Sequence, residues 1–146
     1  MKTFLCQICG HVAFDAAPQK CPVCGAPQAK FAEKPDLLKK AGDGAVGGEI
    51  EQKHVPAITV VKTCGLIPDG CVDVHVKVGE VTHPMVPEHH ITFIDFYLER
   101  TFIARTHLTP EHCNPAAALH LKAASGTLQA VENCNKHGWW FAEKPL

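Results

Sequence analysis

The sequence predicts a mainly β protein in two parts, a small metal-binding knuckle domain followed by a β-sandwich. Three features predict this arrangement: two Cys-x-x-Cys-Gly motifs near the N-terminus, a glycine-rich stretch after them, and a series of short β-rich runs in the remainder. A chain of 146 residues is long enough for one small and one medium domain. We therefore expect domains over residues 1–40 and 49–146, joined by a linker over residues 41–48.

The composition is that of a globular chain, with 46% apolar and 20% charged residues. The formal net charge is −1, so bulk charge predicts no binding to nucleic acid or to a membrane surface. Residues 1–40 carry six lysines against three acidic residues, whereas acidic residues are in excess in the remainder, an asymmetry that favours attraction between the parts. No apolar run approaches the roughly 20 residues of a membrane span, and the N-terminus has no signal-peptide core. We expect a cytoplasmic protein.

Four cysteines form two knuckles, Cys6-x-x-Cys9 and Cys21-x-x-Cys24, each followed by glycine. In such a knuckle both thiolates come from one tight turn, backbone N–H groups point at the sulfurs, and the glycine adopts the left-handed conformation that the turn requires. The spacing predicts one tetrahedral four-sulfur site. Sulfur tetrahedra hold either zinc or iron, and geometry does not separate the two.

A domain of about 35 residues cannot bury a sizeable core, so we expect it to need its metal for folding. Its hydrophobic packing is expected to come from Phe4, Phe14 and Phe31. The segment from Asp36 to Lys40 is expected to form one helical turn with Asp36 as N-cap. Four of the next eight residues are glycine, which is typical of a flexible linker.

Beyond the linker the pattern predicts β-strands. Valines alternate with polar residues from Val72 to Val78, which indicates a half-buried antiparallel strand with His75 on its solvent face. Runs bounded by Gly, Pro or polar turns predict the other strands, at residues 58–63, 90–98, 102–108, 117–122 and 128–133. Six or seven short strands in about 95 residues are typical of a β-sandwich.

Candidate metal ligands lie in three separated loops. Cys134 and His137 are three residues apart, a spacing that lets a thiolate and an imidazole from one turn reach the same ion. The segment from His83 to His90 carries three imidazoles and two prolines that prevent a helix, and His54 adds another imidazole. A nitrogen-rich set with one sulfur suits redox iron better than structural zinc, which usually closes with four ligands.

These three motifs resemble the superoxide reductase family, which includes neelaredoxin and the catalytic domain of desulfoferrodoxin. The resemblance runs from about Glu49 to Trp140 and rests on Lys53-His54-x-Pro56, His83-Pro84-Met85 with His89-His90-Ile91, and Cys134-Asn135-x-His137-Gly138-x-Trp140. It implies an immunoglobulin-like sandwich. The knuckles, with Cys21-Pro22-x-Cys24-Gly25-Ala26-Pro27 and Phe31, resemble the rubredoxin-like domain of rubrerythrin, which implies one iron that shuttles one electron. Desulfoferrodoxins usually have a different small iron domain here.

The resemblance implies a superoxide reductase that reduces superoxide to hydrogen peroxide in the defence against oxidative stress. Its iron would keep an open sixth position and bind His54, His83, His89, His137 and Cys134. Of the adjacent His89 and His90, which point to opposite faces of an extended chain, the family match selects His89. We expect re-reduction through the Cys6, Cys9, Cys21 and Cys24 iron, by rubredoxin or by another small donor, and a homo-oligomer, either a dimer or a tetramer.

The segment before His54 contains the candidate catalytic residue and one departure from the family. Lys53 is expected to attract the anionic substrate and to order the water that supplies a proton. The family usually has Glu immediately before this lysine and uses it as the sixth ligand of resting ferric iron, whereas this chain has Gln52 there and Glu51 one place earlier. Neighbours in an extended segment point to opposite sides, so Glu51 cannot simply replace a glutamate at position 52. The neutral amide of Gln52 is a weaker ligand for ferric iron than a carboxylate. We therefore expect water or hydroxide, and neither side chain, at the sixth position.

The remaining histidines and cysteines have simpler interpretations. His11, His107, His112 and His120 lack a partner at ligand spacing and are expected on the surface or on strand faces. Cys64, Cys71 and Cys113 are expected to be free thiols, because a reducing cytoplasm disfavours a Cys64–Cys71 disulfide. Trp139, Trp140 and Phe141 are expected to pack in the core and to shield the site from water.

Two other classes of function fit the same residues. One is a zinc-ribbon interaction module on a β-sandwich, which would be colourless and contain zinc. The other is a non-catalytic electron-transfer protein with an iron closed to substrate, whose spectrum would not respond to cyanide or azide.

Overall fold

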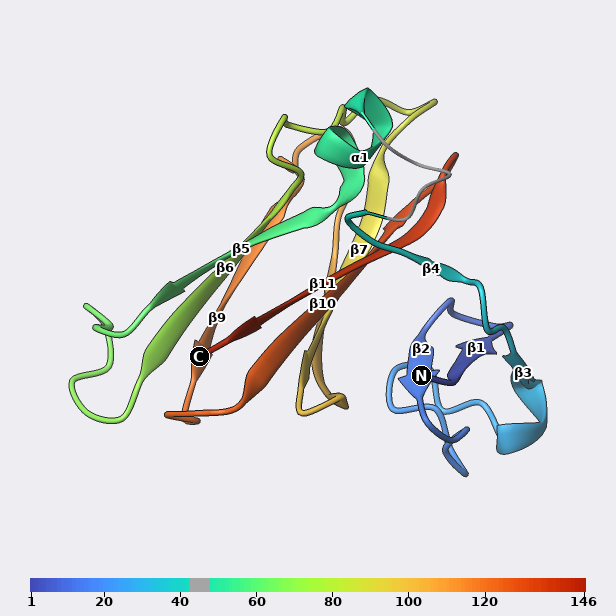
Figure 1. Cartoon of the computed structure of the whole chain (residues 1–146), viewed down its shortest axis with the longest axis horizontal. Helices are drawn as coiled ribbons and strands as arrows, with labels where there is room; N and C mark the ends of the chain where they lie inside the picture. The colour runs from blue at the N-terminus through green and yellow to red at the C-terminus, as the bar shows by residue number, and fades with distance from the viewer. Residues whose placement is uncertain (43–47) are drawn as a thin grey trace.

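The computed structural model describes residues 1–42 and 48–146 and confirms a mainly β chain in two parts (Figure 1). Residues 43–47, the middle of the predicted linker, lie outside the described residues. The small N-terminal part is an antiparallel sheet in the order β2-β1-β3. Its elements are β1 (Thr3–Cys6), β2 (Val12–Phe14), the 3-10 helix η1 (Gln28–Lys30) and β3 (Phe31–Glu33).

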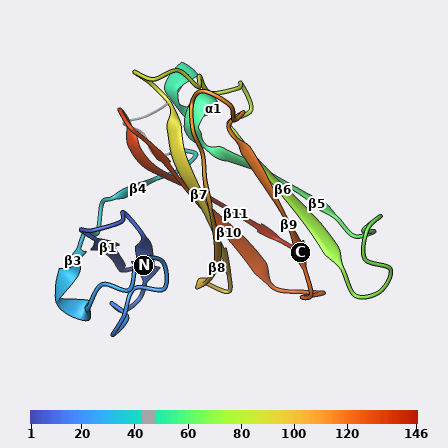
Figure 2. The same cartoon turned by 180° about the vertical axis from the view of Figure 1, so that it is seen from behind.

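The larger part is the predicted β-sandwich, built from two sheets (Figures 1 and 2). One sheet has the order β4-β11-β10-β7-β8, with β4 (Leu38–Lys39), β7 (Ile91–Leu98), β8 (Thr101–His107), β10 (Thr127–Cys134) and β11 (Gly138–Pro145). The other has the order β5-β6-β9, with β5 (Pro56–Val61), β6 (Val72–Val78) and β9 (Ala116–Leu121).

The core of the sandwich lies between the two sheets. The alternation predicted for β6 is confirmed, because its four valines are buried while His75 and Lys77 are exposed. The valines belong to one cluster with Ile91, Ile94 and Phe96 of β7 and with Leu128 and Ala130 of β10. Burial of apolar surface therefore forms the sandwich without any of the predicted metal-binding imidazoles, whose loops are attached at the ends of the strands.

The helical turn expected from Asp36 to Lys40 is wrong. The chain instead forms β4, which pairs in parallel with β11 and places Leu38 opposite Trp139. Leu37 and Leu38 pack against a second apolar cluster that contains Phe14 and Phe141. This packing overrides the weak local preference for a helix. The strand precedes the predicted linker but belongs to the sheet of the larger part.

The extended conformation expected around Glu51 and Gln52 is also wrong. This segment forms α1 (Glu49–His54), the α-helix of the described residues. Acidic residues occupy its first turn and Lys53 and His54 its last turn, the favourable arrangement for the helix dipole. Pro56 disfavours helical geometry at Val55, so the helix ends there. Within the described residues, no helix is long and apolar enough to cross a bilayer.

The small domain packs against the five-stranded sheet. Val12 and Phe14 form one buried cluster with Tyr97, Val131 and Phe141 of the sandwich. The Tyr97 hydroxyl donates a 2.6 Å hydrogen bond to the Val12 carbonyl oxygen. Phe14, which was expected to pack within the small domain, thus contributes to the contact between the domains.

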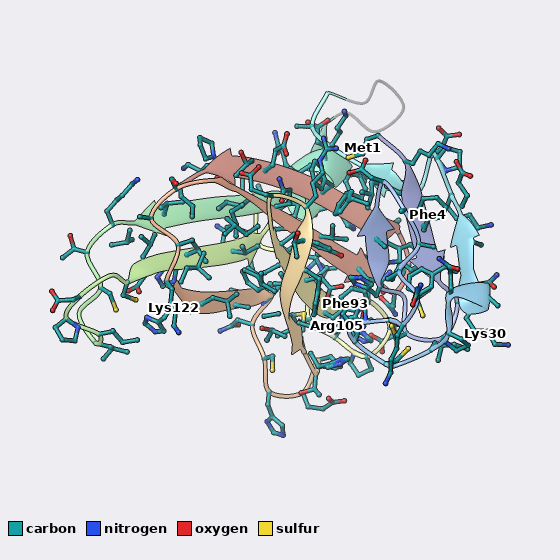
Figure 3. The ribbon with its side chains drawn as sticks, turned by 90° about the horizontal axis from the view of Figure 1, so that it is seen from below. Met1, Phe4, Lys30, Phe93, Arg105 and Lys122 are labelled. Atoms are coloured by element: carbon teal, nitrogen blue, oxygen red, sulfur yellow. The ribbon has the colours of Figure 1, made fainter. Side chains whose placement is uncertain are left out.

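Buried charges cross the same interface. The Arg105 guanidinium forms a bidentate pair with Asp95, at 2.5 and 2.8 Å, and donates a third bond of 2.8 Å to the Cys9 carbonyl oxygen. Figure 3 shows Arg105 beside Phe93, next to the small domain. His11 is 2% exposed, and its Nδ1 lies 3.2 Å from Asp95. The surface position expected for His11 is therefore wrong, because this imidazole is part of the domain contact.

Candidate metal centres

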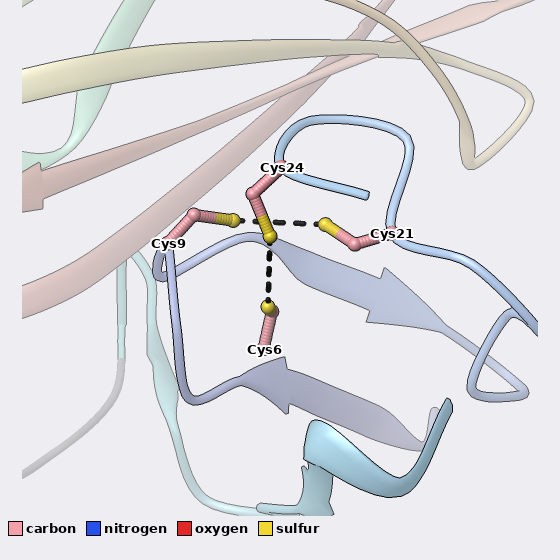
Figure 4. A group of neighbouring side chains, drawn as sticks. All are labelled: Cys6, Cys9, Cys21 and Cys24. Atoms are coloured by element: carbon pink, nitrogen blue, oxygen red, sulfur yellow. Dashed lines mark hydrogen bonds between the residues drawn. The ribbon is translucent and has the colours of Figure 1, made fainter. Parts of the chain in front are cut away.

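The four knuckle cysteines converge on one point between their two turns (Figure 4). The Sγ atoms of Cys6 and Cys24 are 3.7 Å apart, and those of Cys9 and Cys21 are 3.6 Å apart. A tetrahedral ion with sulfur ligands at about 2.3 Å requires sulfur separations of about 3.8 Å. Each turn closes with a bond of 2.9 Å from the glycine N–H to the carbonyl oxygen of the first cysteine, and both glycines have φ close to +80°.

The chemistry of this sulfur cluster fits a bound cation. Burial raises the pKa of Cys9 and of Cys21, since a buried thiolate without a countercharge is unfavourable. A metal ion supplies that countercharge. The backbone of Cys24 and of Val23 acts in the opposite direction and lowers the pKa of Cys21, which favours its thiolate form.

The second cluster lies at one end of the sandwich. His54 is the last residue of α1, His83 and His89 lie in the connection between β6 and β7, and Cys134 and His137 lie where β10 turns into β11. The His54 Nε2 is 3.1 Å from the His83 Nε2 and 3.2 Å from the His137 Nδ1. The Cys134 Sγ is 3.7 Å from the His137 Nδ1.

His89 completes this group. The centroid of its ring is 4.5 Å from that of His83 and 5.0 Å from that of His137. Its Nε2 is buried without a hydrogen-bond partner among the described residues. The neighbouring His90 does not share these ring contacts within the described part of the chain.

The hydrogen bonds made by Nδ1 of His54 and His83 determine whether Nε2 of each ring can bind a metal. The Nδ1 atoms of His54 and His83 each lie 2.7 Å from a backbone carbonyl oxygen, that of Ile50 and that of Pro84. These contacts require N–H at Nδ1 and leave Nε2 with a lone pair. Burial lowers the pKa of both imidazoles to about 4, so both are neutral at pH 7. Two lone pairs facing each other at 3.1 Å repel unless a cation lies between them. The donor set therefore fits a metal ion.

One glycine and one side-chain amide bring the candidate ligand loops together. A Cβ on Gly79 would lie 2.5 Å from the Gln52 carbonyl oxygen, so only glycine lets α1 approach the end of β6 this closely. Asn135 accepts a 2.9 Å bond from the His90 N–H and donates a 3.0 Å bond to the Glu88 carbonyl oxygen. Asn135 thereby joins the histidine loop to the Cys134 turn.

Aromatic and charged side chains surround the second cluster. Trp140 is fully buried and stacks on His54 with centroids 4.8 Å apart, in the shielding position expected of it. Its Nε1 and the Lys39 ammonium both donate to the His137 carbonyl oxygen, at 3.1 and 2.6 Å. Lys39 lies on β4, so the segment that was expected to be helical contacts the turn between Cys134 and His137. Nothing in the local sequence indicated this contact.

Glu132 is a second residue that sequence reasoning missed. It is fully buried two residues before Cys134 on the same strand, and both carboxyl oxygens lack a hydrogen-bond partner among the described residues. Burial raises the pKa of Glu132 well above its ordinary value. Burial also raises the pKa of Cys134, and the Glu132 charge raises it further. The alternation of β10 was the available signal, because it places residues 132 and 134 on one face.

The side chains on α1 point in several directions. The Lys53 ammonium pairs with Glu49 at 2.7 Å and is about one third exposed. The Glu51 carboxylate accepts a 3.1 Å bond from the Gly42 N–H, and Gln52 is exposed. In the part of the chain that the structure describes, no hydrogen bond joins Glu51 or Gln52 to the histidine cluster.

The structure also brings together Cys64, Cys71, Asp73 and His120. The expectation that His120 has no partner among possible ligands is therefore wrong. His107 and His112 are exposed, as expected.

Comparison with known proteins matches both parts of the chain. The desulfoferrodoxin family model matches residues 47–143, and the model of the rubredoxin-like domain of rubrerythrin matches residues 4–32. A desulfoferrodoxin homolog of Methanothermobacter thermautotrophicus is 33% identical over 94% of this chain and 94% of its own length. A superoxide reductase of Pyrococcus abyssi is 35% identical over 65% of this chain and 88% of its own.

Solved structures give the same result. The superoxide reductase (neelaredoxin) of Ignicoccus hospitalis matches with a TM-score of 0.60 and 31% identity, over 75% of this chain and 94% of that one. The match of the family model to residues 47–143 covers more than half of the sequence. The chain belongs to the desulfoferrodoxin family.

Proposed function

We propose that this protein is a superoxide reductase with two non-haem iron ions, one bound by four cysteines and one by four histidines and a cysteine. The observation that carries the proposal is the convergence of imidazole nitrogens, at 3.1 and 3.2 Å from His54 Nε2, beside a single sulfur. The ligands of the second iron are His54, His83, His89, Cys134 and His137. Relatives named superoxide reductase support the assignment.

Five donors leave a six-coordinate ion with one position for substrate, which distinguishes a catalytic metal from a structural one. When bound, the iron supplies the electron that, with two protons, converts superoxide to hydrogen peroxide. The protein holds the imidazoles in the required tautomers through the Ile50 and Pro84 carbonyl oxygens. Trp140 covers the buried side of the cluster and excludes water there.

Lys53 is the proposed catalytic residue, because its ammonium attracts the superoxide anion and holds a proton-donating water. A positive field at the cluster supports this role. Burial is the largest cause that lowers the pKa of His89, and the charges of Lys136 and Lys53 are among those that lower it further. Glu49 opposes this field through its 2.7 Å pair with Lys53.

The proposed electron route from the first iron to the second is short. Gly10, which follows the ligand Cys9, accepts a 2.9 Å hydrogen bond from the Trp139 indole nitrogen. Trp139 is two residues from the ligand His137, so one hydrogen bond connects the two ligand segments. Rubredoxin or another small donor is the proposed source of electrons, and a homo-oligomer is the proposed assembly.

We also propose that neither Glu51 nor Gln52 is a ligand of the resting oxidised site. The Glu51 carboxylate bonds to Gly42, which supports this. Glu51→Ala and Gln52→Ala should then leave the ferric spectrum unchanged. A shift caused by Glu51→Ala alone would identify the displaced carboxylate as the ligand.

The activity is tested by mixing the chemically reduced, iron-loaded protein with superoxide and measuring peroxide and dioxygen. A reductase yields hydrogen peroxide without dioxygen release from the superoxide consumed. Dioxygen formed in proportion to peroxide would indicate dismutation. Absence of any reaction, with spectra unaffected by azide, would support the electron-transfer alternative.

A further inference from the structure

A third group of metal-binding side chains lies on the sandwich, away from both proposed iron sites. Cys64 lies in the connection between β5 and β6, Cys71 directly precedes β6, Asp73 lies on β6 and His120 lies on β9. Figures 1 and 2 show this connection at the end of the three-stranded sheet opposite α1. The three elements meet there because β6 is the central strand of that sheet.

Strand register places three of these ligands on one face. Cys71 and Asp73 are two residues apart along an extended strand, so their side chains point the same way. Asp73 and His120 are directly paired across β6 and β9. The connection after β5 then brings Cys64 to the same point, where its sulfur lies 3.3 Å from the His120 Nδ1.

The distances that involve the two sulfur atoms are those of a tetrahedral site. Cys71 Sγ lies 3.6 Å from His120 Nδ1 and 3.4 Å from Asp73 Oδ1, and the last two atoms are 2.8 Å apart. Metal bonds of about 2.3 Å to sulfur and 2.0 Å to nitrogen or oxygen require ligand separations of about 3.3–3.8 Å, a range that the three sulfur contacts meet. The 2.8 Å contact between His120 and Asp73 is a hydrogen bond, which an entering ion would replace and lengthen. One ligand atom from each of the four residues lies within 4.8 Å of the others, as in the four-cysteine cluster.

Cys64 also has the backbone surroundings of a metal-binding cysteine. Its sulfur accepts N–H groups from the residues two and three places later, Leu66 at 3.4 Å and Ile67 at 3.3 Å. The Cys134 sulfur accepts an N–H from the same relative position three places later, where the His137 nitrogen lies at 3.4 Å. The two clusters on the sandwich therefore each contain one cysteine whose sulfur accepts the N–H of the third residue after it, which stabilises a thiolate.

We propose that Cys64, Cys71, Asp73 and His120 form a third metal site, which takes a zinc ion. Zinc accepts thiolate, imidazole and carboxylate ligands together in a closed four-coordinate site. Binding displaces the two thiol protons and leaves no open position for substrate. The site is therefore structural.

The connection between β5 and β6, which carries Cys64, buries little apolar surface. Leu66 is 78% exposed and Ile67 is 48% exposed, so hydrophobic burial contributes little to its order. A metal bound to Cys64 and Cys71 closes this connection, and His120 fixes it to β9. The ion thus replaces a hydrophobic core at this end of the sheet.

The test is metal analysis of the full-length protein, loaded with iron under reducing conditions, incubated with zinc and then dialysed. We expect one zinc per chain beyond the two iron ions. Cys64→Ser and His120→Ala should each lose that zinc and keep the visible spectra of both iron centres, which report an intact fold. Cys113→Ser, at a cysteine outside all three groups, is the matched control and should retain the zinc.

Two further results decide the proposal. Cobalt in place of zinc should give thiolate-to-cobalt absorption in the wild type and in Cys113→Ser, but not in Cys64→Ser, and His120→Cys should restore the binding lost in His120→Ala. Equal zinc content in Cys64→Ser and Cys113→Ser would overturn the site. A Cys64–Cys71 disulfide, found by alkylation and mass spectrometry of protein prepared without oxidant, would overturn it as well.

Discussion

The two proposed iron centres are held in opposite ways. The cysteine cluster is local, because its four ligands come from two short turns in the first 24 residues. The histidine cluster is assembled from three distant segments by a sandwich that has its own hydrophobic core. The small domain depends on its metal for folding, whereas the sandwich folds through its own core and positions the candidate ligands. The two domains should therefore fail differently when a ligand is lost.

The largest expected effect is that of Cys21→Ser on the small domain. Structural metal binding contributes on the order of 10 kcal/mol to the folding of such small domains, so loss of one thiolate should abolish protection of β1–β3. Hydrogen exchange measured by mass spectrometry should show fast exchange there and retained protection in β6, β7 and β10. Cys134→Ser, the matched ligand change in the sandwich, should remove the second iron and its thiolate absorption but leave β1–β3 protected.

A smaller loss is expected from Arg105→Ala at the contact between the domains. Removal of the guanidinium leaves Asp95 buried without its cation, which typically costs about 3–5 kcal/mol. Arg100→Ala is the control, because Arg100 pairs with Asp15 across the same interface but is exposed, and such pairs contribute about 0–1 kcal/mol. Urea unfolding of both variants checks the difference. Equal loss of unfolding free energy in the two variants would show that burial does not make the Arg105–Asp95 pair contribute more than the exposed pair.

Acid should weaken the metal-free sandwich through the histidines proposed as ligands. His54 and His83 have pKa values of about 4 in the folded chain and near 6.5 when unfolded, so between these values the unfolded state binds more protons. The stability of the metal-free protein should therefore be full above pH 6.5 and fall as the pH decreases toward 4. His54→Gln should flatten this profile, measured as the urea midpoint against pH, and the exposed control His75→Gln should not.

The smallest expected effect concerns the rate with superoxide. Lys53→Ala should slow the second-order reaction by a few-fold at low salt and weaken its dependence on ionic strength, since one positive charge near the cluster contributes about 1 kcal/mol. Glu49→Gln, which removes the partner of Lys53, should change the rate in the opposite direction. Lys122→Ala, a change at an exposed lysine directly after β9, is the control. Rates of Lys53→Ala that equal those of Lys122→Ala would reduce Lys53 to a surface residue.

The sequence predicted what depends on local pattern. The alternation in β6 gave a confirmed strand, and the matched families and sandwich were named correctly. What it missed depends on distant contacts. Leu38 pairs with β11 because of apolar packing, and His11 is buried because the sandwich covers it. His120 and Cys64 are 56 residues apart in the sequence and come together only in the folded sandwich. The conformation of α1 was missed because a six-residue helix carries too few residues for a periodic signal.

We propose that the histidine cluster carries out catalysis and that the cysteine cluster stores an electron. Measuring how many superoxide ions each chain consumes tests this assignment. The fully reduced wild type holds one electron on each proposed iron, so in the absence of other reductant it should consume two superoxide ions per chain. Cys21→Ser should consume one, because its catalytic site remains, and Cys134→Ser should consume none. Consumption by Cys134→Ser, or more than one superoxide per chain in Cys21→Ser, would contradict the assignment of catalysis to the histidine cluster and of electron storage to the cysteine cluster.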